Sequence, residues 1–208
     1  MKIGFNKPYF TGNESLYIED AVKRKKISGN GYYTKKCQDF FESNFGIKKT
    51  LLTTSCTDAL EMCAILCDIK PGDEVIVPSF TFVSSALAFV RQGANIVFAD
   101  SCSHNPNIDI NEIEKLITKK TKVIVVVHYA GVPCDMEKVM SLAKENDLIV
   151  VEDAAQAINA KKLKKRNVTR SVIIVVTIII IIPLLSSDNN NSNNNNNNNN
   201  NNHRHRLT

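Results

Sequence analysis

Two polar clusters in this sequence stand where parallel α/β proteins hold their ligands. TTSCTDAL, residues 53–60, places small hydroxyl residues between an expected strand and an expected helix, where free backbone N–H groups and the helix dipole favour an anion such as phosphate. Glu152 and Asp153 close the apolar strand LIVV, and the carboxyl ends of parallel strands form the ligand crevice. The first cluster also has a purely structural interpretation, since Ser55 or Thr57 could simply cap the helix.

Cys56 lies in the first cluster, at an expected helix N-terminus where thiol pKa values fall. This position raises a cysteine hydrolase as a rival enzyme class. No histidine stands in a recognisable partner context for a thiolate nucleophile, which disfavours that class. The six cysteines (37, 56, 63, 67, 102 and 134) form no CxxC pair, so we expect reduced, mostly structural thiols and no metal site.

Alternating strands and helices are expected to position these clusters. Runs rich in β-branched residues occupy 51–55, 74–78, 95–100, 122–128 and 147–153, and helical apolar spacing fills 57–69, 82–92, 111–119 and 135–147. This alternation predicts βαβ units: an α/β fold with a mostly parallel sheet and helices on both faces. Residues 1–49 are expected to form a leading arm and helix, with SGNGYYT (28–34) as a glycine-rich loop.

The net charge of +5 comes from the C-terminal part of the chain. Residues 159–208 hold eight Lys/Arg against Asp188, which is +7, so residues 1–158 carry −2. This balance argues against a body that binds nucleic acid. MKIGFNKPYF has no apolar segment of the kind found in signal peptides, so we expect a cytoplasmic body.

Beyond residue 158 the composition changes three times. We expect a basic linker over 159–171, an apolar block over 172–185 and a disordered Asn-rich tail over 186–208. The apolar block is shorter than the ~20 residues that a spanning helix needs, which disfavours a membrane anchor. Its β-branched content favours an aggregation-prone β segment instead.

Four motifs taken together resemble a known family. TSCTDALEM, PGDEVIVPSFTFVSSA, VHYAG and VVEDAAQA are similar, in order and spacing, to the DegT/DnrJ/EryC1/StrS sugar-nucleotide aminotransferases over about residues 1–158. The resemblance implies the N-terminal part of a fold-type-I large domain that depends on pyridoxal 5′-phosphate (PLP). It also implies a homodimer that converts a nucleotide-linked 4-keto-6-deoxyhexose into its 4-amino sugar, with glutamate as amino donor.

The resemblance assigns roles to five residues. Thr57 and Asp58 match the helix N-terminus whose backbone amides hold the cofactor phosphate, and Phe82 matches the aromatic that stacks on the pyridine ring. Asp153 matches the carboxylate that pairs with the pyridine nitrogen and keeps it protonated, which improves the ring as an electron sink. Gln156 matches the side chain near the phenolic oxygen of the cofactor.

His128, in VHYAG, has two open interpretations, a contact to the site or a structural histidine at a strand end.

The sequence departs from the family at the Schiff-base lysine. In the family this lysine follows the aspartate by roughly 30 residues, at the end of the next strand. No lysine occurs after Lys165, and the lysines at 161–165 are too close to Asp153 to match. We therefore expect no catalytic lysine, a truncated and inactive aminotransferase, and a sheet that stops after Asp153 with an exposed edge.

Two further interpretations concern the chain as a whole. One is a non-enzymatic remnant or partner subunit that pairs with a full-length paralogue. The other treats the sequence after about residue 158 as foreign to the family, the product of a frameshift, a retained intron or a truncated gene copy.

Overall fold

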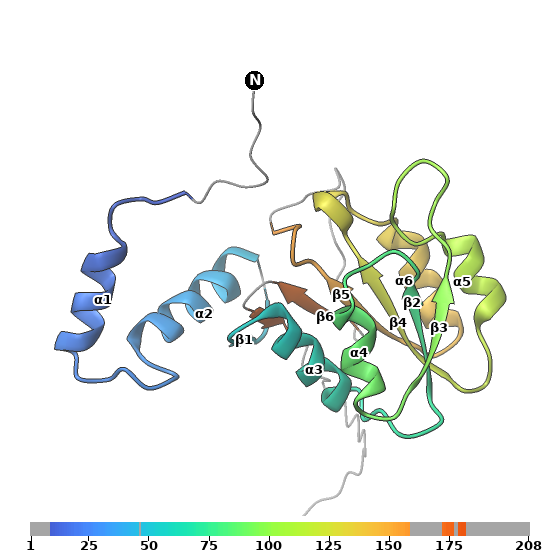
Figure 1. Ribbon diagram of the computed structural model, residues 1–208, viewed down its shortest axis with the longest axis horizontal. Coiled ribbons are helices and arrows are strands. Elements are labelled where there is room, and N and C mark those ends of the chain that lie inside the picture. Colours follow the sequence, from blue (N-terminus) through green and yellow to red (C-terminus); the bar gives the residue numbers. More distant parts are fainter. Residues whose placement is uncertain (1–8, 46, 159–171, 177–178, 182–208) are drawn as a thin grey trace, which may run out of the picture.

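The computed structural model describes residues 9–45, 47–158, 172–176 and 179–181 of the chain (Figure 1). Its elements are α1 (Glu14–Lys23), α2 (Tyr32–Phe45), β1 (Thr50–Leu52), α3 (Cys56–Leu66), β2 (Glu74–Pro78), α4 (Ser84–Val90), β3 (Asn95–Ala99), α5 (Ile110–Leu116), β4 (Thr121–Val127), a 3-10 turn η1 (Tyr129–Gly131), α6 (Met136–Glu145), β5 (Ile149–Asp153), β6 (Val172–Val176) and β7 (Ile179–Ile181).

The strands form one mixed sheet in the order β1-β7-β6-β5-β4-β2-β3. Pairs from β6 to β3 are parallel, whereas β7 runs antiparallel to both β1 and β6. Parallel strands are buried on both faces, which explains why β2, β4 and β5 read as continuous β-branched runs. The predicted mostly parallel α/β sheet is confirmed.

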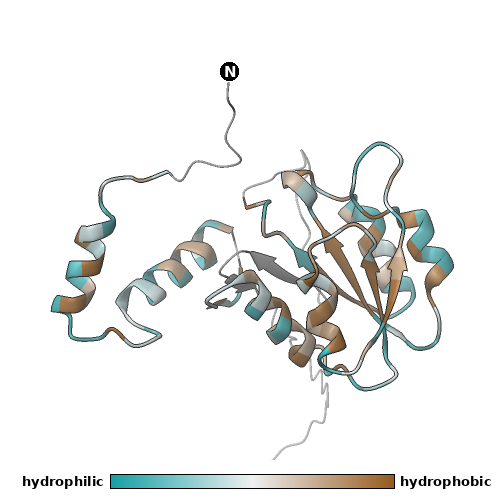
Figure 2. Cartoon of the chain, viewed as in Figure 1, coloured by the Kyte–Doolittle hydropathy of each residue, from teal (hydrophilic) through white to brown (hydrophobic). Residues whose placement is uncertain are grey.

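Helices cover both faces of the sheet, as predicted. On one face, Leu60 of α3 and Phe89 of α4 pack with Val75, Val125 and Val151. On the other face, α5 and α6 cover a second cluster that includes Ile76, Ile113, Ile124, Val139 and Val150. Figure 2 shows the apolar residues concentrated in the central strands and in the helix faces beside them. Because successive strand residues face opposite clusters, Asp153 lies on the α3/α4 face and Glu152 on the α5/α6 face.

The expectation that the sheet stops after Asp153 is wrong. β6 pairs in parallel with β5, with Asp153 beside Val175 in the register, and β7 returns to pair with β1. The physical reason is that an open β5 edge offers unpaired backbone groups, and a β-branched segment can pair with them. The apolar block therefore contributes two strands to the sheet within its described part, 172–176 and 179–181. The predicted linker (159–171) and Asn-rich tail (186–208) lie outside the described residues.

The leading segment contains two helices, α1 and α2, instead of the one expected. Tyr32–Thr34, assigned to the glycine-rich loop from the sequence, belong to the first turn of α2. Neither helix buries a residue. α1 lies away from the sheet, whereas α2 lies beside β1, where Glu42 accepts a hydrogen bond from the Thr50 amide (Figure 1). Within the described ranges, no helix has the length and apolarity needed to cross a bilayer.

Candidate cofactor site

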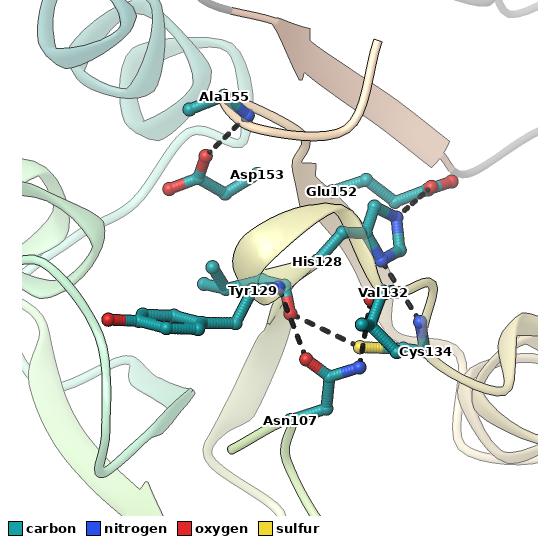
Figure 3. A network of polar contacts seen from close by, with 9 residues as sticks. Asn107, His128, Tyr129, Val132, Cys134, Glu152, Asp153 and Ala155 are labelled. Atoms are coloured by element: carbon teal, nitrogen blue, oxygen red, sulfur yellow. Dashed lines mark hydrogen bonds and ion pairs between the residues drawn. The ribbon is translucent and has the colours of Figure 1, made fainter. Parts of the chain in front are cut away.

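Asp153 is a buried carboxylate at the carboxyl end of β5, with 5% of its surface exposed. Its Oδ2 accepts a hydrogen bond from the Ser85 hydroxyl at 2.9 Å. Its Oδ1 accepts from the Ala155 amide at 3.1 Å, shown in Figure 3, and from the Cys56 thiol at 3.6 Å. Donors of this kind stabilise a negative charge that burial alone would disfavour.

Three elements therefore meet at one carboxylate. Cys56 is the first residue of α3, Ser85 lies in the first turn of α4, and Asp153 ends β5. The amide of Ser85 also donates to the carbonyl of Phe82 at 3.0 Å, which fixes Phe82 one turn from the carboxylate. The Phe82 ring is 71% exposed, so its aromatic face is available to a ligand.

The N-terminus of α3 is capped by Ser55, whose hydroxyl accepts from the Asp58 amide at 3.0 Å. The Asp58 carboxylate accepts from the Thr54 hydroxyl, a hydrogen bond that lowers the pKa of Asp58. Among the described residues, the amides of Cys56 and Thr57 have no acceptor. Two donors thus remain at the positive end of α3, and the Asp58 amide is not one of them.

Cys56 does not have the lowered pKa that its helix position suggested. Burial, followed by the nearby Asp153 charge, raises the pKa of the Cys56 thiol to about 12. A thiol in this state is a poor nucleophile at neutral pH. The rival hydrolase interpretation therefore loses its nucleophile, and Cys56 acts as a weak donor to Asp153.

Gln156 ties two loops together at the same edge of the sheet. Its Oε1 accepts from the Ala130 amide at 2.7 Å, and the side-chain NH2 of this exposed residue remains as a donor group. Ala130 has a φ of 51° and Gly131 a φ of 80°. A Cβ at Gly131 would lie 3.2 Å from the Gln156 carbonyl oxygen, so only glycine fits this turn without strain.

His128 is held on the opposite face of the sheet, away from Asp153. Its Nδ1 accepts from the Cys134 amide at 3.1 Å, so the ring proton is on Nε2, which lies 2.9 Å from Oε2 of Glu152 (Figure 3). Asn107 fixes the same loop by donating to the Val132 carbonyl at 2.9 Å. Of the two sequence interpretations of His128, the structural one fits these contacts.

The residues predicted from the sequence lie at the carboxyl edge of the sheet. Other residues, which the sequence did not indicate, connect them by hydrogen bonds. Ser85 and Cys56 connect the Phe82 and Thr57 segments to Asp153, and Thr81 in turn donates to Ser85. The sequence offered one weak signal for Thr81 and Ser85, their i, i+4 spacing in SFTFVSSA. It offered nothing to separate Ser85 from its neighbour Ser84.

A comparison with known protein families identifies the family of this chain. The DegT/DnrJ/EryC1/StrS aminotransferase family matches residues 9–173. The chain belongs to this family. The match continues past residue 158 and reaches residue 173, in β6, so the expectation that family sequence ends at about residue 158 is wrong. PLP is the cofactor of this family, and the predicted partial fold-type-I domain is confirmed.

Similar proteins are aminotransferases of amino-sugar chemistry. A GDP-perosamine synthase of Escherichia coli O157:H7 is 36% identical over 155 residues, covering 74% of this chain and 43% of the relative. A dTDP-3-amino-3,6-dideoxy-alpha-D-galactopyranose transaminase of Aneurinibacillus thermoaerophilus is 40% identical over 146 residues, covering 69% of this chain and 40% of the relative. The chain thus spans about two fifths of the length of these curated relatives.

Two solved structures have a fold similar to that of this chain. An aminotransferase from Psychrobacter cryohalolentis matches with a TM-score of 0.76 and 30% identity, over 84% of this chain and 48% of its own. Spr1654 of Streptococcus pneumoniae in its PLP form matches with a TM-score of 0.75 and 25% identity, over 88% of this chain and 54% of its own.

Proposed function

We propose that this chain forms the PLP-binding half of a sugar-nucleotide aminotransferase large domain. The observation that carries the proposal is the buried Asp153 carboxylate, which lies at the carboxyl edge of the sheet and accepts from Ser85, Ala155 and Cys56. Its donors are all neutral, and among the described residues no cationic side chain lies against it. It can therefore receive a positively charged ring N–H from a ligand.

The surrounding residues fit the remaining parts of PLP. The free amides of Cys56 and Thr57 suit the phosphate, because a helix N-terminus favours an anion. The exposed ring of Phe82 suits the flat face of the pyridine, and the NH2 donor of the exposed Gln156 suits the phenolic oxygen. Asp58 takes part through the cap, since its own amide donates to Ser55.

When bound, PLP supplies an electron sink for transfer of an amino group. The contribution of this chain would be to hold PLP in place and to set the charge of its ring. Asp153 would hold the proton on the pyridine nitrogen, and the α3 N-terminus would bind the phosphate. Phe82 would stack on the ring and keep water from it.

The substrate proposal follows from the names of the relatives. Both curated relatives described above act in the chemistry of nucleotide-linked amino sugars. We therefore propose a nucleotide-linked 4-keto-6-deoxyhexose as amino acceptor and glutamate as donor for the ancestral activity of this domain.

The chain itself is proposed to lack catalysis. In the register, Val175 of β6 lies beside Asp153, so the carboxyl end of β6 is the next strand end along the sheet. β6 ends at Val176 and β7 begins at Ile179, and residues 176–179 of the sequence contain no lysine. An aminotransferase needs a lysine there to attach the cofactor and move the substrate proton.

Titration of the purified chain with PLP, followed by absorbance and fluorescence, tests the binding proposal. We expect saturable binding in the wild type and its loss in D153A. The matched control is D100A, because Asp100 is an exposed carboxylate that follows β3 at the same edge of the sheet. Equal PLP affinity in D153A and wild type would refute the proposed site.

Incubation with glutamate and PLP tests the proposed lack of catalysis. We expect no formation of 2-oxoglutarate above that given by PLP alone, and no PLP mass on the chain after borohydride reduction. Transamination that disappears in D153A would contradict this part of the proposal while supporting the site.

A partner subunit is a second candidate function, favoured by the N-terminal helices. α1 carries four large apolar residues that are more than half exposed, Leu16, Tyr17, Ile18 and Val22. Exposed apolar groups in this number on one short helix mark an interaction surface. We propose that it docks on a full-length family member, as in the homodimer that the resemblance implies.

Co-expression with a tagged full-length paralogue, followed by size-exclusion chromatography, tests the partner proposal. We expect a 1:1 complex that the double variant L16E/I18E weakens. The control is E19K, which changes an exposed charge on the same helix and should leave the complex intact. Self-association without binding to the paralogue would contradict it.

A further inference from the structure

We infer that Ser85 is a positioning residue that holds the Asp153 carboxylate with Oδ2 toward the cofactor. This inference rests on the proposed PLP site.

The two oxygens of Asp153 are not equivalent. Oδ1 accepts from two donors, the Ala155 amide at 3.1 Å and the Cys56 thiol at 3.6 Å. Among the described residues, Oδ2 accepts from Ser85 alone, at 2.9 Å. A carboxylate oxygen offers about two lone-pair directions, so Oδ1 is saturated and Oδ2 retains one free direction. A ring N–H must therefore approach Oδ2, beside the Ser85 hydroxyl.

The Ser85 hydroxyl is itself oriented by Thr81. The Thr81 hydroxyl donates to Ser85 Oγ at 2.9 Å, so the hydrogen of Ser85 is directed at Asp153. The contact of Ser85 with Asp153 is buried, since Ser85 is 0% exposed, whereas the contact with Thr81 is partly buried. Hydrogen bonds in such a chain polarise one another, and this strengthens the donor that reaches Oδ2.

The same serine also locates the stacking aromatic. Its amide donates to the Phe82 carbonyl at 3.0 Å, while its hydroxyl holds Asp153. Ser85 thus links the residue proposed to cover the face of the ring to the residue proposed to bind its nitrogen. Loss of the hydroxyl is expected to release the carboxylate while the backbone link to Phe82 remains.

Two measurements on the full chain test this inference. The first is the dissociation constant of PLP for wild type, S85A, T81V and S84A. The second is the 15N chemical shift of bound PLP labelled at the pyridine nitrogen, which reports its protonation. S84A is the matched control, because Ser84 is a buried serine next to Ser85 that makes no side-chain hydrogen bond among the described residues.

We expect S85A to weaken PLP binding about tenfold, the size typical of a charge-assisted hydrogen bond, and to move the 15N shift toward the unprotonated ring. T81V should shift both quantities in the same direction by a smaller amount, and S84A should match the wild type. In a D153A background, S85A should add nothing, because its effect acts through Asp153.

Wild-type affinity and an unchanged 15N shift in S85A would overturn the inference while leaving the proposed site intact. The same holds if S84A changes both quantities as much as S85A. If S85A does not fold, judged by circular dichroism, T81V decides the question, since Thr81 is only partly buried. A wild-type chain that binds no PLP refutes the proposed function and this inference with it.

Discussion

His128 and Glu152 lie on neighbouring strand ends and form a buried pair, with His128 Nε2 2.9 Å from Glu152 Oε2. Their side chains are 5% and 2% exposed. The pair lies on the opposite face of the sheet from Asp153, and the Cys134 amide fixes the other ring nitrogen of His128. It therefore supports the strand ends that carry the candidate site without touching the proposed cofactor.

Removal of the histidine is expected to cost more stability than neutralisation of the glutamate. H128A leaves a cavity at a buried ring and takes away one donor of the Glu152 carboxylate, at a cost of about 3 kcal/mol in the free energy of unfolding. E152Q keeps an oxygen acceptor for the same N–H and should cost about 1 kcal/mol. Urea denaturation followed by circular dichroism measures both. An H128A protein as stable as E152Q would contradict a structural role for the pair.

Alkaline pH should destabilise the fold through the buried thiols of α3. Burial raises the pKa of Cys67 from 9.0 to about 12. Between about pH 9 and 12 the Cys67 thiol keeps its proton in the folded state and loses it in the unfolded state. Its contribution to the free energy of unfolding is therefore fully present below about pH 9 and falls as the pH rises. The loss is about 1.4 kcal/mol per pH unit for one thiol.

The comparison of wild type with C67A isolates this effect. Urea unfolding between about pH 8 and 10.5 should show a shallower fall in stability for C67A, whatever its stability at neutral pH. C37A is the control, because Cys37 is exposed. Equal slopes for wild type and C67A would contradict the raised pKa.

The proposed phosphate site can be tested by deletion of a single backbone donor. Ser55 has extended dihedrals, φ −153° and ψ 164°, which suit a residue before proline, and the first position of a helix tolerates proline. C56P therefore removes one free amide, while C56A keeps that amide and loses the same thiol. We expect C56P to bind PLP about tenfold more weakly than C56A. Equal affinities would place the phosphate elsewhere.

The turn that contacts Gln156 predicts different effects at two adjacent positions. G131A puts a Cβ at a φ of 80° and 3.2 Å from the Gln156 carbonyl, so it should destabilise the fold by about 1 kcal/mol or more. A130G relieves a φ of 51° and should be close to neutral. Thermal unfolding measures both variants. Similar melting temperatures for G131A and wild type would contradict the strain argument.

Local sequence pattern was sufficient for the central elements of this fold. The strand at 74–78 has the predicted bounds, and β3 ends one residue before its prediction. β1 is shorter than its prediction, Thr50–Leu52 against 51–55, because Ser55 leaves the strand to cap α3. These features depend on β-branched runs and on capping residues, which act over a few neighbouring positions.

The sequence by itself determined the family, the parallel α/β core and the presence of an acid at the end of β5. Only the tertiary structure decided that β6 and β7 complete the sheet beside β5, and that Ser85 and Cys56, more than 60 residues from Asp153, donate to its carboxylate. The physical reason is that strand pairing and side-chain hydrogen bonds depend on proximity in space. Burial, which raises the pKa of Cys56 against the trend for helix N-termini, is likewise a property of the packed fold.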